Sequence, residues 1–339
     1  MKAIVCRELG PPESLVLDDV QPASLEPGQV RIRVAACGIN FPDLLLIRGL
    51  YQEKPDLPFV PGGEVAGVVE EVADDVTWPV PGERVMAVTY RGGLAESVNA
   101  AVAEVYPMPD GMSFETAAAF PGVYGTSLHA LRQRAVLRAG ETLLVLGAAG
   151  GVGLAAVQIG KALGARVIAA AGGAEKTGFL RHTGADEVID YATEDIRESV
   201  RRLTQGKGAD VVFDPVGGDL FDEAIRCAGW NGRVLVVGFA SGRIPRLPVN
   251  LALLKGIAVV GVYYGRFVKE EPGVAAANMR ELAELYANAR VRPHVHRTFP
   301  LAETAAAMQC LETRQVIGKV VVTLQPDQAA QTLRSRSRQ

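Results

Sequence analysis

The stretch "LLVLGAAGGVGLAAVQIGKALGARVIAAAGG", Leu143 to Gly173, decides the fold. A short apolar run leads into a cluster of glycines, a segment with helical spacing follows, and a second apolar run closes the stretch. This order predicts a strand, a tight turn, a helix and a second, parallel strand. Gly147, Gly150 and Gly153 stand three residues apart in the turn, with Gly151 beside the middle one. Glycines so placed let backbone N–H groups and a helix N-terminus approach a pyrophosphate, which predicts a dinucleotide-binding unit.

The composition excludes several classes of protein. The chain has 339 residues, 48% of them hydrophobic and 22% charged, which is typical of a soluble α/β protein with two domains. The net charge of −3 is mixed along the sequence and basic residues gather only at residues 332–339, so we expect a solvated tail and no nucleic-acid partner. Four scattered cysteines without metal-ligand spacing, and the lack of a long apolar segment, predict a cytoplasmic protein with reduced thiols and no membrane span.

The pattern around the opening stretch predicts two domains. Strands and helices alternate over residues 123–265, which predicts a parallel sheet covered by helices on both faces. Residues 1–122 are short β-rich runs broken by glycine and proline, which indicates a small β domain. Residues 266–339 offer too few elements for a domain of their own, so we expect them to return and complete the β domain.

The residues after the second strand of the opening stretch indicate which dinucleotide is bound. An NAD site places a carboxylate there, about 20 residues after the first glycine, on the ribose hydroxyls. The sequence at that place is "VIAAA", residues 167–171, without a carboxylate, and Lys176 and Arg181 follow. A cation favours the 2′-phosphate of NADPH. The alternative is that Lys176 is an ordinary solvated lysine at a helix start.

The order of these parts resembles the zinc-free quinone oxidoreductase branch of the medium-chain dehydrogenase/reductase superfamily, over about residues 1–324. The resemblance implies a GroES-like β-rich catalytic domain, a doubly wound Rossmann domain with a parallel sheet, NADPH as cofactor and a homodimer. The motifs that carry it are "GINFPDLLLIRGLY" (38–51), "PFVPGGEVAGVV" (58–69), "GAAGGVGLAAVQIGKALGA" (147–165), "GADEVIDY" (184–191) and "GKVVV" (318–322).

The same resemblance implies that the protein holds no catalytic zinc. Zinc-dependent relatives have a cysteine where this chain has Asn40 and a histidine where it has Gly63. Cys37 and Glu64 remain, and we interpret them as a core cysteine and a structural carboxylate. Hydride transfer to an electron-poor acceptor needs little Lewis-acid help because the acceptor delocalises the charge. A quinone is therefore the favoured acceptor, and an activated alkene, either an enone or an enoyl-CoA, is the alternative.

The resemblance also implies which residues form the site. We expect Asn40 and Tyr51 to hydrogen-bond the developing oxyanion or to position the acceptor. Asp43 and Arg48 border the same cleft, either with a direct role or as an ion pair that fixes the loop. The residues implied for the cofactor are Thr126 near the nicotinamide, Gly147, Gly150, Gly151, Val152 and Gly153 at the pyrophosphate, Lys176 and Tyr191 at the 2′-phosphate, and Phe239, Ala240, Ser241 and Lys319 along the cofactor.

Several alternatives stay open from the sequence. Alkene reduction needs a proton donor, for which Tyr51, Tyr263 and Tyr264 are candidates. Arg266, near the expected mouth of the cleft, belongs to a segment that either narrows the pocket or binds an acidic substrate. A non-catalytic NADPH-binding protein is a third class of function. The apolar runs "RVLVVGF" and "GIAVVGVYYG" are suited to edge strands of a dimer and equally to buried central strands.

Overall fold

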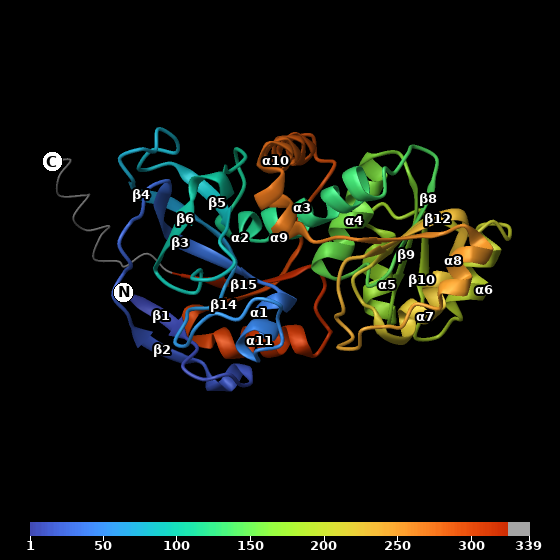
Figure 1. The fold of residues 1–339 in the computed structure, drawn as a ribbon, viewed down its shortest axis with the longest axis horizontal. Helices are drawn as coiled ribbons and strands as arrows, with labels where there is room; N and C mark the ends of the chain where they lie inside the picture. Colours follow the sequence, from blue (N-terminus) through green and yellow to red (C-terminus); the bar gives the residue numbers. More distant parts are fainter. Residues whose placement is uncertain (325–339) are drawn as a thin grey trace. The chain divides into compact units, whose positions relative to one another are not determined.

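The computed structural model describes residues 1–324, and the chain divides into two compact units (Figure 1). The first unit comprises Met1–Pro121 and the chain from His294 onward, and the second comprises Gly122–Pro293. The first unit is therefore discontinuous in sequence. The predicted basic tail, residues 332–339, lies outside the described residues.

The second unit is built on a six-stranded sheet in which every paired strand is parallel to its neighbour. The strand order is β10-β9-β8-β11-β12-β13, which is the 3-2-1-4-5-6 order of a doubly wound dinucleotide-binding sheet. The predicted doubly wound parallel sheet is thus confirmed. Its strands are β8 (Thr142–Val145), β9 (Arg166–Ala171), β10 (Glu187–Asp190), β11 (Ala209–Asp214), β12 (Ala228–Val236) and β13 (Ala258–Gly261).

Helices cover both faces of this sheet, which is why its strands read as continuous apolar runs. Leu143 and Leu144 point to opposite faces, and both are fully buried. Leu143 packs against Gly160 of α4, whereas Leu144 shares a core with Phe221 of α7. The helices of this unit are α3 (Pro121–His129), α4 (Gly151–Ala162), α5 (Ala174–Arg181), α6 (Ile196–Leu203), α7 (Gly218–Cys227), α8 (Val249–Lys255), α9 (Tyr264–Glu270) and α10 (Pro272–Ala287).

Residues 266–293 pack on the second unit, whereas the sequence assigned them to the β domain. The rings of Phe267 and His129 stack with their centroids 3.8 Å apart. Asn278 and Gln133 exchange two side-chain hydrogen bonds of 2.9 and 3.1 Å. These contacts bind α9 to the last residue of α3 and α10 to the segment that follows α3, and the return to the β domain begins only at His294.

The first unit is β-rich, and the C-terminal return completes its main sheet. The sheet runs β14-β15-β3-β4-β5-β7, with β6 also paired to β3, and a separate hairpin joins β1 to β2. Its strands are β1 (Lys2–Val5), β2 (Val16–Asp19), β3 (Gln29–Ile39), β4 (Glu64–Val72), β5 (Arg84–Val88), β6 (Ser97–Ala101), β7 (Val105–Pro107), β14 (Val295–Pro300) and β15 (Lys319–Thr323). The accompanying helices are α1 (Phe41–Ile47), α2 (Phe114–Ala117) and α11 (Thr304–Glu312).

The C-terminal return places β15 in the sheet beside β3, from which it is far apart in the sequence. β15 lies beside β3 (Figure 1) and pairs antiparallel with it, with Val320 opposite Ile39. On its other side β3 pairs with β4, where Cys37 lies opposite Val65. The first residues of β15 and β4 therefore flank the end of β3, where Asn40 begins α1.

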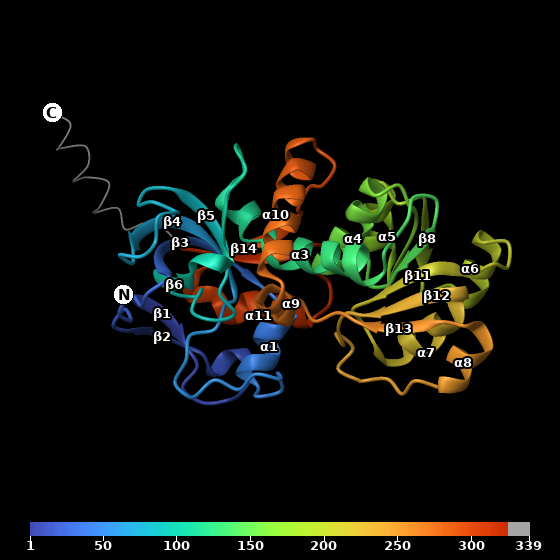
Figure 2. The ribbon, with the colours of Figure 1, turned by 45° about the horizontal axis from the view of Figure 1, so that its top comes forward.

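The two apolar runs left open by the sequence occupy different places in the parallel sheet. "RVLVVGF" contains part of β12, which is an interior strand between β11 and β13. "GIAVVGVYYG" contains β13, which is an edge strand of the sheet (Figure 2). Three of the four residues of β13 are exposed, so this run is the one with a free edge.

Candidate functional site

The glycine-rich turn follows β8 and opens α4, as predicted. Gly150 is the N-cap of α4, and its N–H donates to the carbonyl of Gly147 at 2.9 Å. A Cβ on Gly153 would stand 2.2 Å from that same carbonyl oxygen, so only glycine permits this contact of helix and turn. Gly147 has a φ of +54°, and its Cβ would meet Val216 beyond the neighbouring strand β11. The first turn of α4 thus has the backbone donors and the close approach that a pyrophosphate requires.

The turn after β9 gathers the residues predicted for the 2′-phosphate. Gly172 is covered by the ring of Tyr191, since a Cβ there would lie 2.9 Å from its Cε2 atom. Lys176 is the third residue of α5, directly after this turn, whereas Arg181 is the last residue of that helix. Asp190 stands nearby, but its Oδ1 accepts the N–H groups of Gly173 and Ala192 at 2.9 and 3.0 Å. That carboxylate is a structural acceptor, and the end of β9 itself carries only alanine and glycine.

The loop after β11 contains a buried carboxylate that the sequence reading missed. Asp214 is 1% exposed, and its Oδ1 accepts the N–H groups of Val216 and Gly217 at 2.8 and 2.9 Å. Burial raises the pKa of Asp214, and these two N–H donors oppose the shift. The signal that would have found it is the acid in "FDPVGG", where a strand runs directly into a proline and two glycines.

The residues after β12 that are predicted to line the cofactor, 239–241, pack against this loop after β11. The N–H of Ala240 donates to Pro215 at 3.1 Å, and that of Ser241 donates to Val216 at 2.9 Å. A Cβ on Gly217 would meet the ring of Phe239 at 2.9 Å. The turns after β8, β9, β10, β11 and β12 all lie at the carboxyl edge of the sheet, which is where open α/β sheets bind ligands.

Thr126, predicted beside the nicotinamide, lies on α3. Its hydroxyl donates to the carbonyl of Gly122 at 2.7 Å, within its own helix. The next residue, Ser127, donates to the carbonyl of Val152 at 2.8 Å, which attaches α3 to the first turn of α4. The helix that carries Thr126 is therefore attached to the first turn of α4, and the role of Thr126 beside the nicotinamide stays a prediction.

In the first unit, Asn40 belongs to a buried polar network with Glu64 and Lys319. The exposed fractions of Glu64 and Lys319 are 1% and 5%. Lys319 Nζ donates to Glu64 Oε2 at 3.0 Å, to Asn40 Oδ1 at 2.5 Å and to the carbonyl of Ile39 at 3.0 Å. An ammonium group has three N–H donors, and all three are used inside this unit. Lys319 therefore has no donor left for a cofactor, contrary to the sequence-based expectation.

The carboxylate of Asp43 caps the N-terminus of α1. It is 4% exposed, and its Oδ2 accepts the backbone N–H of Asn40 at 2.7 Å as part of a capping box. Burial raises the pKa of Asp43 to about 6, against the opposing effects of that N–H and of Lys319. Cys37 lies in the same core, and burial raises the pKa of its thiol well above the usual range.

Arg48 and Tyr51 stand further along the same segment. Arg48 pairs with Glu312 of α11, so it does not form the ion pair with Asp43 that the sequence offered as an alternative. Tyr51 is half-buried and packs against the core of the first unit. The roles of Asn40, Asp43, Arg48 and Tyr51 toward an acceptor stay predictions.

The two tyrosines after β13 have different environments, one buried and one exposed. Tyr264 is buried, and its hydroxyl fills the space beside Gly125, where a Cβ would stand 2.2 Å away. Tyr263 is 45% exposed. Arg266 pairs with Glu270 on the exposed face of α9. Tyr264 is thus a packing residue, which leaves Tyr51 and Tyr263 as the candidate proton donors.

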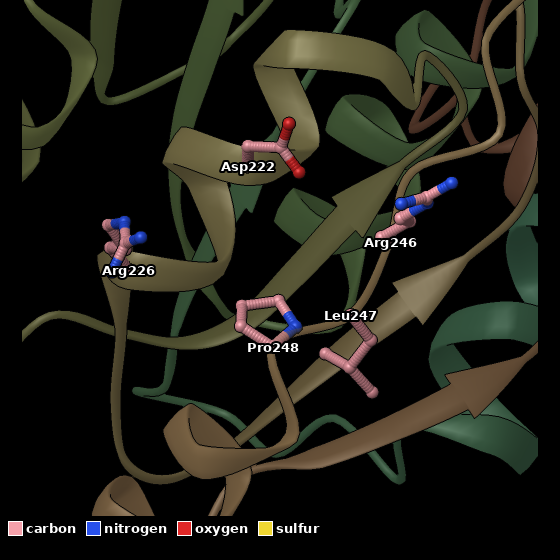
Figure 3. Close-up of a pocket in the computed structure, with 5 residues that line it drawn as sticks. All are labelled: Asp222, Arg226, Arg246, Leu247 and Pro248. Carbon is pink, nitrogen blue, oxygen red and sulfur yellow. The ribbon is translucent and has the colours of Figure 1, made fainter.

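Two surface pockets of the second unit are lined by none of the predicted cofactor residues. One, of about 380 Å³, is lined by Asp222 and Arg226 of α7 and by Arg246, Leu247 and Pro248 before α8 (Figure 3). The other, of about 660 Å³, includes Gly208 and Trp230 near the amino ends of β11 and β12. Neither contains a residue of the glycine-rich turn. We therefore take the carboxyl edge, and not these pockets, as the candidate cofactor site.

Within residues 1–324, no three His, Cys, Asp or Glu side chains are arranged to hold a metal ion. Over the same residues, no helix is both long and apolar enough to cross a membrane. The four cysteines are free thiols, and Cys6, Cys37 and Cys227 are buried.

Comparison with known proteins adds relatives over almost the whole chain. Residues 26–110 match the family described as "Alcohol dehydrogenase GroES-like domain", and residues 151–282 match "Zinc-binding dehydrogenase". The Nematostella vectensis protein named "Quinone oxidoreductase-like protein 2 homolog" is 40% identical, over 95% of this chain and 88% of its own length. The "Quinone oxidoreductase" of Pseudomonas aeruginosa is 38% identical, over 95% and 99%. A solved structure of Escherichia coli quinone oxidoreductase complexed with NADPH has a TM-score of 0.89 at 29% identity, over 95% of this chain and 100% of that one.

Proposed function

The chain belongs to the medium-chain dehydrogenase/reductase superfamily of oxidoreductases, and from this premise we propose that it transfers hydride from NADPH to a quinone without zinc. The observation that carries the proposal is the carboxyl edge of the parallel sheet. At this edge lies the glycine-rich turn at residues 147–153, which we call the glycine cradle. The end of β9, which follows it, carries no carboxylate, and Lys176 comes soon after.

The residues of the cradle fit NADPH. The absent Cβ of Gly150 lets a pyrophosphate approach the start of α4, Gly153 lets that helix pack closely on the turn, and the helix N-terminus favours the charge of the pyrophosphate. Lys176 would hold the 2′-phosphate by a charge-assisted hydrogen bond, with the ring of Tyr191 beside it. Phe239, Ala240 and Ser241 would line the path of the cofactor because they follow β12 and pack against the loop after β11, at the carboxyl edge of the sheet. A relative that is solved with NADPH supports this assignment.

In the proposed reaction, NADPH supplies a hydride, and one proton from solvent completes the reduction of the quinone to a hydroquinone. The protein has to orient the acceptor and stabilise the charge that develops on its oxygen. We assign that task to the amide of Asn40 and the hydroxyl of Tyr51.

Zinc independence is supported by the chemistry of the side chains around Asn40. A carboxamide is not among the usual zinc ligands. The neighbouring carboxylate oxygen, Glu64 Oε2, already accepts from Lys319 and from Asn40 at 3.0 Å each. The charge of Glu64 is thus balanced by an ammonium group of the chain itself.

The experiment is a steady-state assay of NADPH oxidation against 1,4-benzoquinone, 1,2-naphthoquinone, methyl vinyl ketone and acrylyl-CoA. The proposal predicts turnover with the two quinones and its loss in the Asn40→Ala variant. Turnover restricted to the two alkenes would assign the protein to enone or enoyl-CoA reduction. NADPH binding without turnover of any acceptor would favour the non-catalytic alternative.

We also propose that the protein is a cytoplasmic homodimer that pairs through β13. The exposed edge of β13 and its Val259, which is 36% exposed, support the pairing, because an uncovered edge strand favours association. The free thiols support a reducing compartment. Val259→Lys is expected to give a monomer in analytical ultracentrifugation, whereas Leu50→Lys, at an exposed leucine of the first unit, is expected to leave the dimer intact.

A further inference from the structure

Three elements that are far apart in the sequence meet around the side chain of Asn40. Asn40 follows β3, Glu64 is the first residue of β4, and Lys319 is the first residue of β15. Because β3 lies between β15 and β4 in the sheet, the two charged residues stand on either side of Asn40. Asn40 Oδ1 accepts from Lys319 Nζ at 2.5 Å, and Asn40 Nδ2 donates to Glu64 Oε2 at 3.0 Å.

The charges of these neighbours determine which end of the carboxamide points where. An ammonium group only donates and a carboxylate only accepts, so the oxygen of the amide must face Lys319 and its nitrogen must face Glu64. The reversed amide would oppose two donors on one side and two acceptors on the other. The ion pair therefore permits a single orientation of a side chain that otherwise has two of similar shape.

The same geometry leaves one donor of Asn40 weakly engaged. One N–H of Nδ2 is directed to Glu64, and the other reaches the carbonyl of Gly38 only at 3.4 Å. This is at the long end of the range for a hydrogen bond. Asn40 is half-buried, unlike Glu64 and Lys319. Its second N–H is thus the donor of the network that an incoming acceptor oxygen can engage.

We propose that Lys319 and Glu64 are positioning residues, which act on the reaction by locking the amide of Asn40 with its N–H group toward the acceptor. This inference rests on the proposed function, since it assigns the stabilising contact to Asn40. It also gives Lys319 a role other than cofactor binding, because all three of its N–H donors lie within the network.

The kinetic test is a double-mutant cycle between Lys319→Met and Asn40→Ala, followed by single-turnover oxidation of bound NADPH by 1,4-benzoquinone. The proposal predicts that Lys319→Met slows hydride transfer about tenfold or more in the wild-type background and has almost no effect in the Asn40→Ala background. The Kd for NADPH is expected to stay within about twofold in every variant. Equal slowing in both backgrounds, or a Kd that rises about tenfold, would overturn the proposal.

A second variant covers the case in which Lys319→Met fails to fold because Glu64 is left as an unpaired buried charge. Lys319→Met combined with Glu64→Gln removes both charges at nearly constant volume. The proposal predicts that this variant folds, binds NADPH like the wild type and still transfers hydride about tenfold more slowly, because the two charged partners that hold the amide orientation are gone. Wild-type hydride transfer in this variant would contradict it.

A spectroscopic readout separates this inference from the proposed function. The side-chain amide of Asn40, labelled with ¹⁵N and assigned by its loss in Asn40→Ala, is expected to give two distinct proton signals, of which the N–H directed to Glu64 is protected from solvent exchange. In Lys319→Met with Glu64→Gln, the protection should fall. If the wild type shows the protected proton but reduces no quinone, the proposed function fails and the positioning role stands. If the wild-type amide exchanges like a solvated one, the positioning role fails whatever the activity.

Discussion

Lys319 Nζ lies 3.0 Å from Glu64 Oε2, although the two residues are separated by most of the sequence and are 5% and 1% exposed. Removal of one partner leaves the other charge buried and uncompensated, so we expect Lys319→Met to lower the free energy of unfolding by about 3–5 kcal/mol. Lys319→Met with Glu64→Gln should recover most of that loss. The measurement is urea unfolding in a Trp230→Phe background, where Trp78 is the remaining tryptophan and reports on the first unit.

A matched control comes from the same sheet. Arg33 and Glu70 form an ion pair at 3.2 Å with side chains 39% and 41% exposed. Arg33→Met is expected to change the free energy of unfolding by less than about 1 kcal/mol, because exposed pairs contribute little. An equal loss of unfolding free energy in Arg33→Met and Lys319→Met would show that burial of the Lys319–Glu64 pair does not increase its contribution to stability.

Gly153→Ala tests the glycine cradle. Its Cβ would stand 2.2 Å from the carbonyl oxygen of Gly147 and 2.9 Å from the Cα of Ala148, so the helix has to move away from the turn. We expect a loss of about 1–3 kcal/mol in stability and a Kd for NADPH at least about tenfold higher, measured by fluorescence titration.

Gly178→Ala is the control for that substitution. Gly178 lies within α5, and a Cβ there would have no neighbour within 4 Å. Because alanine is the better helix former, this variant should be more stable by about 0.4–1 kcal/mol, with an unchanged Kd. An unchanged Kd for NADPH in Gly153→Ala would contradict the assignment of the glycine cradle to NADPH binding.

Lys176→Ala tests the choice of cofactor. Loss of a charge-assisted hydrogen bond to the 2′-phosphate should weaken NADPH binding by roughly 10- to 100-fold, and NADH binding should be unaffected because NADH lacks that phosphate. Arg181→Ala, at the far end of the same helix, is expected to change neither Kd. Equal weakening of both nucleotides by Lys176→Ala would instead indicate a structural role.

The buried carboxyl of Asp43 should make the first unit less stable as the pH rises. Burial raises its pKa in the folded protein from 3.8 to about 6, so the folded state binds the proton more tightly than the unfolded state. The resulting destabilisation develops between about pH 4 and about pH 6, and it approaches about 3 kcal/mol. Asp43→Asn should therefore gain stability relative to the wild type over that interval.

The measurement is the urea midpoint at a series of pH values, with Trp78 as the probe. Asp74→Asn, which removes an exposed carboxylate of the same unit, is the matched control. A constant difference between Asp43→Asn and the wild type from pH 4 to pH 7 would contradict the assignment.

The parallel sheet could be predicted from the sequence because its signals are local. Each buried strand is a continuous apolar run, and Gly147, Gly150 and Gly153 mark the turn by spacing alone. The lack of an acidic residue after β9 can also be read directly from the sequence. Predictions that rested on such short segments agree with the strands β8 to β13.

Other features depend on contacts between distant segments, which spacing does not reveal. The amphipathic pattern of α10 indicates that it has a buried face but not that this face meets Gln133 of the second unit through Asn278. The partner of Lys319 follows from the register of β15 on β3, which sets it beside Asn40. Likewise, Arg48 pairs with Glu312, and only the docking of α11 brings them together.

The central claim is tested most directly by stopped-flow mixing of the protein, loaded with one equivalent of NADPH or of NADH, with 1,4-benzoquinone. The account predicts rapid oxidation of bound NADPH in a single two-electron step to the hydroquinone, and little oxidation of NADH at one equivalent because NADH binds more weakly. Bound NADPH that persists in the presence of the quinone, at a rate no faster than in free solution, would contradict it.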